Sequence, residues 1–339
     1  MKKTMISIFV LLIFLQGCNF KEVPNDPSDE ISEEPIVNDP VEQLPVLRSL
    51  TNGLPVDDRK AKLFGVIIEN SPAAWPHSGL SQADIVYEIY MEGYSVTRFL
   101  AIFSQFPEKI GPVRSARIPF VSIMVDWMIP FVHYGSAQRG LGNAYSIIKQ
   151  VSWPIRFDGV SGLNDDFFFR DNGRSAPHNA YFNAKSASIK LPALEVEEHF
   201  SYDEKSNIVG TGATIVQVTY TSNNKIEYRF NDSSHHYDRY VNGKPMVDAD
   251  SKSQVSVKNI IIQFANHSTV ESINYVLVDL SNSGKAMFIN NGIQSEGTWI
   301  RDGVHGKTSF FLSNGSALVL SPGNTWIQIV SDRVKISVK

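Results

Sequence analysis

The chain has 339 residues and a formal net charge of −4, with 42% hydrophobic and 19% charged residues. An aromatic content of 11% excludes a disordered chain, and the ordinary Gly and Pro contents exclude a collagen-like one. A small negative net charge gives no electrostatic reason to expect nucleic-acid binding. The single cysteine, Cys18, excludes both an intrachain disulfide and a zinc site built from clustered cysteines.

The first 17 residues are typical of a bacterial lipoprotein signal peptide. A basic start is followed by an apolar run from Met5 to Leu15, which is too short to span a bilayer as a helix. Cys18 stands at the expected cleavage position, where a lipid such as palmitate would be attached. We therefore expect a protein anchored through Cys18 at the extracytoplasmic face of the cell membrane. The alternative is an ordinary signal peptide followed by an incidental cysteine.

Residues 18–55 read as an extended acidic linker. Residues 19–48 hold two basic and eight acidic residues, and five prolines lie between positions 24 and 45. The two lysines of the signal peptide are removed with it, so the chain beyond residue 48 carries 27 basic and 27 acidic residues. The negative charge of the whole chain therefore belongs to the linker, and the folded part is neutral.

Residues 56–192 predict a mixed α/β domain. The expected strands alternate with two expected helices, one of which has a proline near its first turn. The expected strands are 64–69, 85–90, 97–103 and 130–135, and the expected helices are 118–128 and 140–149.

Residues 193–339 predict a mostly antiparallel β domain, so that the chain as a whole belongs to the α+β class. No helical pattern follows Pro192, and tight-turn pairs such as Asn242-Gly243 and Asn291-Gly292 separate short β-type runs. The expected strands are 214–220, 225–230, 237–241, 258–264, 273–279, 285–289, 298–301, 308–312, 317–320 and 325–330.

Three polar clusters interrupt the apolar sequence of the first half. Arg114 and Arg117 precede the helix expected at 118–128, where guanidinium groups and the helix amino terminus could face one anion. Pairing of these arginines with Glu88 or Glu92 is the structural alternative.

The other two clusters lie at the end of a strand and in a loop. His133, Tyr134 and Ser136 end an apolar strand, and His133 is either an acid-base group or a satisfied core histidine. Residues 167–179 form a loop-like segment that contains Arg170, Asp171, Arg174, His178 and Asn179. Such a loop is either a binding segment or one pinned by ion pairs.

The sequence contains no motif for several other kinds of binding or catalytic site. His77, His133 and His178 have no metal-ligand spacing, and His235-His236 falls in a turn, so we expect no metal and no cofactor. Ser115 and Ser136 lack the context of a hydrolase nucleophile, and no phosphate-loop or dinucleotide fingerprint occurs. Trp299 and Trp326 are expected in the core, with stacking on sugars as the alternative.

Long stretches of the sequence resemble the YerB-type lipoprotein family of Gram-positive bacteria. The resemblance implies an envelope-anchored, two-domain protein of uncharacterised function, and it supplies no catalytic residue. It rests on residues 69–74, 78–88, 97–103, 111–117, 133–136, 168–170 and 176–179 in the first half, and on 242–245, 257–263 and 322–327 in the second.

Three hypotheses for the function stay open, and they differ on whether the protein is an enzyme. The first is binding of an anionic cell-wall polymer or envelope partner by an arginine-rich cleft of Arg98, Arg114, Ser115, Arg117, Tyr134, Arg170, Arg174 and Asn179. The second is an envelope hydrolase or transferase with His133 and His178 as acid and base, and Asp171 or Glu88 as the orienting carboxylate. The third is a scaffold that recruits cell-wall synthesis proteins.

Overall fold

The structure is a computed structural model that describes residues 46–270, 274–303 and 306–339. The signal peptide, Cys18 and residues 19–45 lie outside the described residues. Residues 46–339 form one compact unit, which includes residues 46–55 of the expected linker. There the Thr51 hydroxyl donates a 2.8 Å hydrogen bond to the Asp84 carboxylate, and the Thr51 carbonyl accepts one of 2.7 Å from Tyr202. The packed part of the chain therefore starts before residue 56.

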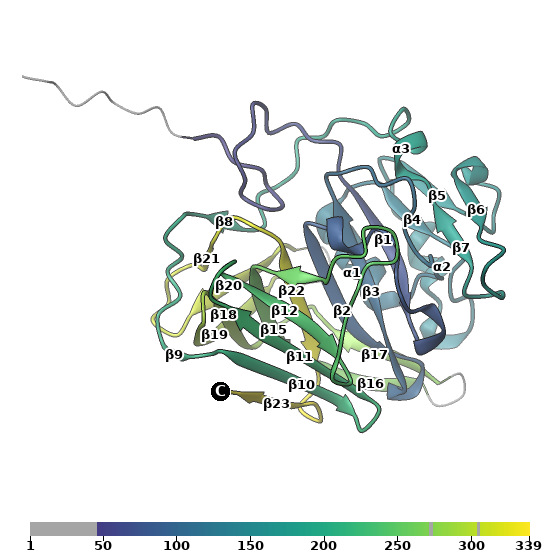
Figure 1. The fold of residues 1–339 in the computed structure, drawn as a ribbon. Helices are drawn as coiled ribbons and strands as arrows, with labels where there is room; N and C mark the ends of the chain where they lie inside the picture. The colour runs from purple at the N-terminus through teal and green to yellow at the C-terminus, as the bar shows by residue number, and fades with distance from the viewer. Residues whose placement is uncertain (1–45, 271–273, 304–305) are drawn as a thin grey trace, which may run out of the picture. The chain divides into compact units, whose positions relative to one another are not determined.

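An eleven-stranded mixed sheet runs through the centre of the unit (Figure 1). In spatial order its strands are β20 (Thr308–Leu312), β19 (Ile293–Arg301), β18 (Ser283–Asn290), β15 (Asn259–Phe264), β22 (Thr325–Val330), β2 (Ile85–Met91), β3 (Val96–Phe103), β1 (Phe64–Asn70), β4 (Phe131–His133) and β5 (Arg156–Asp158), with β9 (Thr211–Gly212) paired to β19.

A second, six-stranded sheet contains only strands from the second half of the chain. Its strands are β13 (Lys244–Pro245), β12 (His236–Val241), β11 (Asn224–Asn231), β10 (Ile215–Thr221) and β23 (Lys335–Val338), with β14 (Ser256–Val257) paired to β12. Three two-stranded sheets join β16 (Asn266–Val270) to β17 (Tyr275–Asp279), β8 (Ser201–Tyr202) to β21 (Val319–Leu320), and β6 (Phe168–Arg170) to β7 (Ala180–Phe182).

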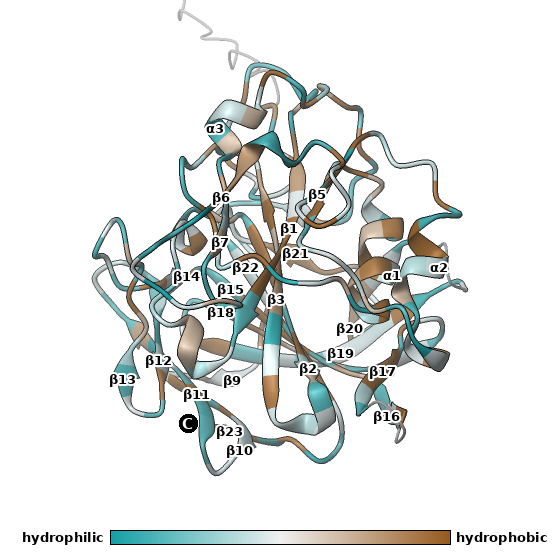
Figure 2. Cartoon of the chain, turned by 90° about the vertical axis from the view of Figure 1, so that its right-hand side faces the viewer, coloured by the Kyte–Doolittle hydropathy of each residue, from teal (hydrophilic) through white to brown (hydrophobic). Residues whose placement is uncertain are grey.

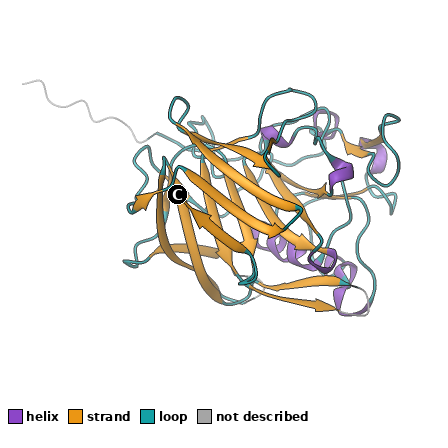
Figure 3. Cartoon of the chain, turned by 60° about the horizontal axis from the view of Figure 1, so that its bottom comes forward, coloured by secondary structure: helices purple, strands orange, loops and turns teal. Residues whose placement is uncertain are grey.

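Helices are few (Figure 3), and in the described residues all of them precede residue 188. The α-helices are α1 (Ile118–Trp127), α2 (Ala144–Ile148) and α3 (Ala184–Ala187), and the 3₁₀ turns are η1 (Pro72–Ala74), η2 (Leu80–Gln82), η3 (Glu92–Tyr94), η4 (Gly140–Gly142) and η5 (Asp165–Phe167). The helix expected at 118–128 and the absence of helices after Pro192 are thus confirmed for the described part of the chain. Strands are the main secondary structure of the described chain, and most of them follow residue 192.

The two sequence halves share the central sheet. β22 lies between β2 of the first half and β15 of the second, and it is parallel to both. Trp326 of β22 is therefore opposite Val86 on one side and Ile260 on the other. The sequence predicted a mixed α/β domain followed by a mostly antiparallel β domain, and the main-chain hydrogen bonds between β2 and β22 join strands of both halves in one sheet.

Both faces of the central sheet are covered, which explains why β1, β2 and β22 are buried at every residue. The six-stranded sheet packs on one face, where Trp326, Tyr228 and Tyr237 belong to one hydrophobic cluster. α1 packs on the other face through Phe120 and Met124. Hydrophobic residues are accordingly concentrated on the central strands and on α1 (Figure 2). Trp299 and Trp326 are each 1% exposed, which confirms that both belong to the core.

Candidate functional site

A pocket of about 300 Å³ opens at one end of the central sheet, where the segment between β3 and α1 passes the ends of β1 and β4. We call it the Arg114 pocket. It contains four of the residues predicted from the sequence, and its lining is Arg114, Ser115, Tyr134, Gly135, Ser136, Gln138, Val160, Arg170, Pro177 and Ala180.

Main-chain hydrogen bonds fix the two walls of the Arg114 pocket against each other. The Arg114 N–H donates to the carbonyl of Ile67 in β1 at 2.9 Å, and the Arg114 carbonyl accepts from the Tyr134 N–H at 3.0 Å. The Ser115 hydroxyl donates to the Tyr134 carbonyl at 2.9 Å. Arg114, Ser115 and Tyr134 therefore stand on backbone that the sheet holds in place.

A buried histidine shapes the turn at Gly135. His133 Nδ1 donates to the Gly135 carbonyl at 2.8 Å, and Asp158 accepts from the Gly135 N–H at 2.9 Å. The other ring nitrogen of His133 lies 3.3 Å from Arg156 Nη1, from which it accepts, so the ring is neutral. Burial lowers the pKa of His133 to about 4, in agreement with these contacts. His133 is fully buried and does not line the pocket, which assigns it a positioning role.

Arg114 is the guanidinium of the pocket that has unused donors. Its Nε lies 3.5 Å from Glu69 Oε2, and its side chain is 26% exposed. Neither Nη of Arg114 makes a hydrogen bond with a described residue. The same oxygen of Glu69 accepts a 2.9 Å hydrogen bond from His178 Nδ1, which ties the 170–178 loop to the end of β1. His178 contacts Glu69 and does not line the pocket.

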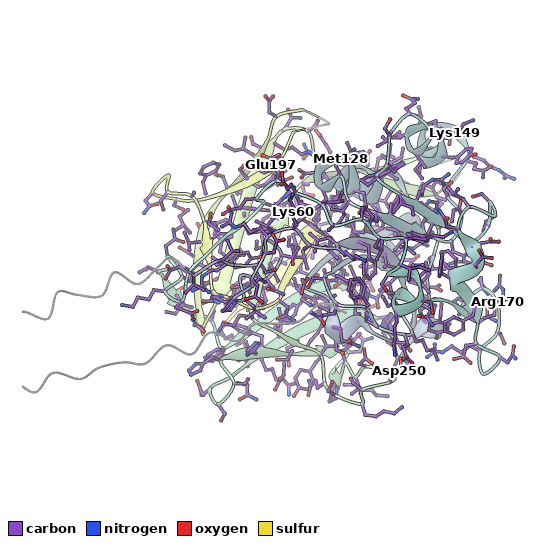
Figure 4. The ribbon with its side chains drawn as sticks, turned by 90° about the horizontal axis from the view of Figure 1, so that it is seen from above. Lys60, Met128, Lys149, Arg170, Glu197 and Asp250 are labelled. Atoms are coloured by element: carbon purple, nitrogen blue, oxygen red, sulfur yellow. The ribbon has the colours of Figure 1, made fainter. Side chains whose placement is uncertain are left out.

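Arg170 supplies the second guanidinium of the Arg114 pocket. It donates to the Tyr134 hydroxyl at 3.0 Å and to Asn179 Oδ1 at 2.5 Å, and it lies 5.2 Å from the centre of the Tyr134 ring. Arg170 comes from β6 at the periphery of the molecule (Figure 4). Asn179 is buried, and its contact with Arg170 orients the guanidinium toward Tyr134.

Arg98 and Arg117 share one carboxylate instead of lining the pocket. Arg98 donates to Glu92 Oε1 at 2.9 Å and Arg117 donates to the same oxygen at 2.8 Å, so pairing with Glu92 is confirmed for Arg117. Burial, together with the nearby Arg117 and Arg114, lowers the pKa of Arg98 to about 10. Glu92 is thus paired with Arg98 and Arg117, and Arg114 acts on it as well, so three guanidinium groups face the two carboxylates of Glu92 and Glu69 beside the pocket.

The remaining loop residues pin the loop. Arg174 donates to the Ala73 carbonyl at 3.3 Å and to the Pro76 carbonyl at 2.6 Å. Asp171 forms a 2.6 Å ion pair with Lys109, which lowers the pKa of the Asp171 carboxyl. Neither Arg174 nor Asp171 lines the pocket.

Glu88 lies in the core between the sheets. It and Arg239 of β12 form an ion pair of 2.7 Å, and both side chains are 0% exposed. Gln328, Asn70 and Thr97 donate to the remaining carboxylate positions. This arrangement joins the two halves of the chain and assigns Glu88 a structural role.

Neither a metal site nor a membrane span occurs in the described part of the chain. No group of three or more His, Cys, Asp or Glu residues there could hold a metal ion. Within residues 46–270, 274–303 and 306–339, every helix is too short or too polar to cross a membrane.

Sequence reasoning missed the carboxylates that organise the site. Glu69 contacts both Arg114 and His178, and Asp158 holds the Gly135 turn. The signal for Glu69 was a single acid at the end of an otherwise apolar strand. Asp158 also follows an apolar residue in β5, but its partner is 23 residues distant in the sequence and carries no pattern.

Comparisons with known proteins identify the family. The N-terminal and C-terminal domains of the family described as "Protein of unknown function (DUF3048)" match residues 50–197 and 216–327. The chain is 31% identical over 343 residues to a Bacillus subtilis (strain 168) protein named "Putative lipoprotein YerB", covering 98% of this chain and 96% of that one.

The fold is also that of a solved relative. The crystal structure of the YerB protein from Bacillus subtilis has a TM-score of 0.74 and 31% identity to this chain. The similarity covers 86% of this chain and 99% of the YerB chain in the crystal. The chain therefore belongs to the two-domain DUF3048 family, together with YerB.

Proposed function

We propose that the protein is a membrane-anchored extracytoplasmic lipoprotein whose Arg114 pocket binds an anionic group of a cell-envelope component. The observation that carries the proposal is the Arg114 guanidinium, whose Nη donors are unused by described residues while it lines a pocket of about 300 Å³. Tyr134 and Arg170 line the same pocket and are hydrogen-bonded to each other. Paired guanidinium donors match the oxygens of a phosphate or a carboxylate.

Local charge supports an anion as the ligand. Four guanidinium groups, those of Arg98, Arg114, Arg117 and Arg170, lie in or beside the pocket, and they face two carboxylates, those of Glu69 and Glu92. The folded part of the chain is neutral as a whole, so this excess of positive charge is a local feature. A pocket of this volume accommodates a single charged group with a small substituent, such as a phosphoglycerol unit or a carboxylated amino-acid end.

The anchoring part of the proposal rests on the Cys18 pattern and on the name of the Bacillus relative. Labelled palmitate should be incorporated into the wild-type chain in a Gram-positive host. The Cys18→Ala chain should incorporate none. Incorporation of label into the Cys18→Ala chain would contradict the anchor.

The pocket is tested by titrating the full chain in detergent with glycerol phosphate and with N-acetyl-D-alanine, followed by calorimetry. Arg114→Gln should weaken binding by roughly ten- to a hundredfold, which is the value of a charge-assisted hydrogen-bond pair. Arg114→Lys should retain an intermediate affinity, because a point charge remains without the planar fork.

Arg59→Gln is the matched control. Arg59 is an exposed arginine that pairs with Glu198 at 3.4 Å, away from the pocket, and its loss should leave binding unchanged. Equal affinity of Arg114→Gln and the wild type for both probes would refute the pocket as the anion site.

A further inference from the structure

A second surface, separate from the Arg114 pocket, carries unbalanced positive charge. The outer face of the six-stranded sheet is hollowed by a groove of about 900 Å³, three times the volume of the Arg114 pocket. We call it the lysine groove. Its lining is Gln217, Thr219, Ser222, Asn223, Lys225, Glu227, Asn242, Gly243, Lys335, Ser337 and Lys339. No residue of this lining belongs to the Arg114 pocket.

Strand register places the lysines on one face. β10 alternates along its length, so that Val216, Val218 and Tyr220 are buried while Gln217 and Thr219 face outward. Thr219 is opposite Lys225 of β11 on one side and opposite Lys335 of β23 on the other. The Cα atoms of the two lysines are therefore separated by two strand spacings, roughly 10 Å.

The positive charge of the groove is compensated only in part from within. Lys225, Lys335 and Lys339 are exposed, and their Nζ atoms make no hydrogen bond or ion pair with a described residue. The one acid of the lining, Glu227, is already paired with Arg229, and it accepts a 2.6 Å hydrogen bond from Gln217. The groove thus has three lysines and one carboxylate, on which Arg229 and Lys339 both act, so its net charge is positive in a folded part that is neutral overall.

The rest of the lining consists of small donors and hydroxyls. Thr219, Ser222 and Ser337 place hydroxyl groups between the lysines, and Gly243 has open space around its Cα. Among the described residues of the lining, none is aromatic, so the groove has no platform on which a sugar ring could stack. Lysines and hydroxyls spaced along a groove match a chain of phosphate groups.

We propose that the lysine groove binds an extended phosphodiester or polyphosphate chain, distinct from the small anionic group of the Arg114 pocket. Charge complementarity argues for the occupant, since three lysines meet repeated negative charges at a separation that successive phosphates can reach. The concave shape favours a polymer that enters the groove over a flat anionic membrane. Lys225 and Lys335 bind neighbouring phosphates, and Lys339 extends the track along β23.

The experiment measures binding of linear polyphosphate to the full chain in detergent by calorimetry at several salt concentrations. The wild type should bind with an affinity that falls steeply with salt, with a logarithmic slope of about 2 for three phosphate contacts. The triple variant Lys225→Gln, Lys335→Gln, Lys339→Gln should lose at least about tenfold in affinity and most of that slope. Its melting temperature should match the wild type, because all three side chains are exposed.

The matched control removes the same charge elsewhere. The variant Lys149→Gln, Lys205→Gln, Lys285→Gln replaces three exposed lysines outside the groove, and it should bind polyphosphate as the wild type does. An equal loss in this control would mean that net charge alone drives binding, and it would overturn the groove. Binding of the groove triple at wild-type affinity would overturn it as well.

Two further experiments distinguish a polymer from a membrane surface, and the lysine groove from the Arg114 pocket. The first measures binding of the reconstituted wild-type chain to anionic vesicles. Vesicle binding that depends on the three lysines, without polyphosphate binding, would refute a polymer ligand and indicate a membrane surface. Arg114→Gln should leave polyphosphate binding intact, so that failure of the groove and failure of the Arg114 pocket are distinguishable.

Discussion

The buried ion pair of Glu88 and Arg239 provides the strongest prediction about what holds the two halves together. All four acceptor positions of Glu88 are occupied, by Arg239 at 2.7 Å, Gln328 at 3.0 Å, Thr97 at 2.7 Å and Asn70 at 3.1 Å. Replacement of Arg239 by Met would leave a carboxylate of 0% exposure without its countercharge. Removal of one partner of such a pair costs about 3–5 kcal/mol of unfolding free energy.

Glu88→Gln should cost a similar amount, because the Arg239 guanidinium would then be the buried unpaired charge. The double variant Glu88→Gln, Arg239→Met should cost less than the sum of the two single variants, by about 2 kcal/mol or more. Urea unfolding at neutral pH, followed by tryptophan fluorescence and by circular dichroism, measures all four free energies. The two probes should report one transition, since the pair joins β2 to β12.

An exposed pair serves as the control. Glu108 and Lys185 lie 2.6 Å apart with side chains about 70% exposed, so Glu108→Gln should change stability by less than about 0.5 kcal/mol. A cost below about 1 kcal/mol for both Glu88→Gln and Arg239→Met, or additive costs in the double variant, would refute the reasoning.

Two further predictions concern the glycine turn and the buried histidines. Gly135 has a φ of +72°, and a Cβ there would lie 3.1 Å from Val160. Gly135→Ala should therefore lower the free energy of unfolding in urea by about 1–2 kcal/mol and weaken glycerol phosphate binding. Unchanged stability would contradict the backbone strain. Burial lowers the pKa of both His77 and His133 to about 4, below the unfolded value of 6.5. As the pH falls from 6.5 toward 4, the unfolded state therefore binds protons before the folded state does, and the free energy of unfolding decreases. The free energy of unfolding should decrease by about 2 kcal/mol per histidine between about pH 7.5 and pH 5. A smaller decrease in His77→Gln than in the wild type would support this prediction, and an identical decrease would contradict it.

Local sequence patterns predicted the strands of the second half well. Asn242 and Gly243 have φ values of 50° and 76°, and Asn291 and Gly292 have 48° and 74°, the two positive angles that a tight hairpin turn requires. The second pair connects β18 to β19, as expected from the sequence, whereas the first connects β12 to β13, a two-residue strand that was not among those expected. The signal is local, because the turn residues and the flanking alternation lie within a few positions of one another.

The pairing of distant strands could not be predicted in the same way. β2 and β22 are separated by more than 200 residues and pair along their length, with Glu88 opposite Gln328. An apolar run indicates that a strand is buried, but main-chain hydrogen bonds are the same for every residue type, so the run does not indicate which strand pairs with it. The shared sheet was therefore missed, although nearly all of its strands were expected individually.

The site was predicted in part for the same reason. Arg114, Ser115, Tyr134 and Arg170 were recognised as candidates and do line one pocket. Which arginine keeps free donors depended on Glu69 and Glu92, whose contacts reach across the fold. Residue type and spacing indicated the chemistry, whereas long-range partners decided which side chains are available.

Anomalous scattering from a selenate ion gives the most direct test of the Arg114 pocket. A crystal of the protein soaked in selenate should show an anomalous peak within hydrogen-bond distance of the Arg114 Nη atoms, on the wall formed with Tyr134 and Arg170. The same peak should be absent from a crystal of the Arg114→Gln variant. A wild-type crystal with selenate bound elsewhere and no peak at Arg114 would contradict the account.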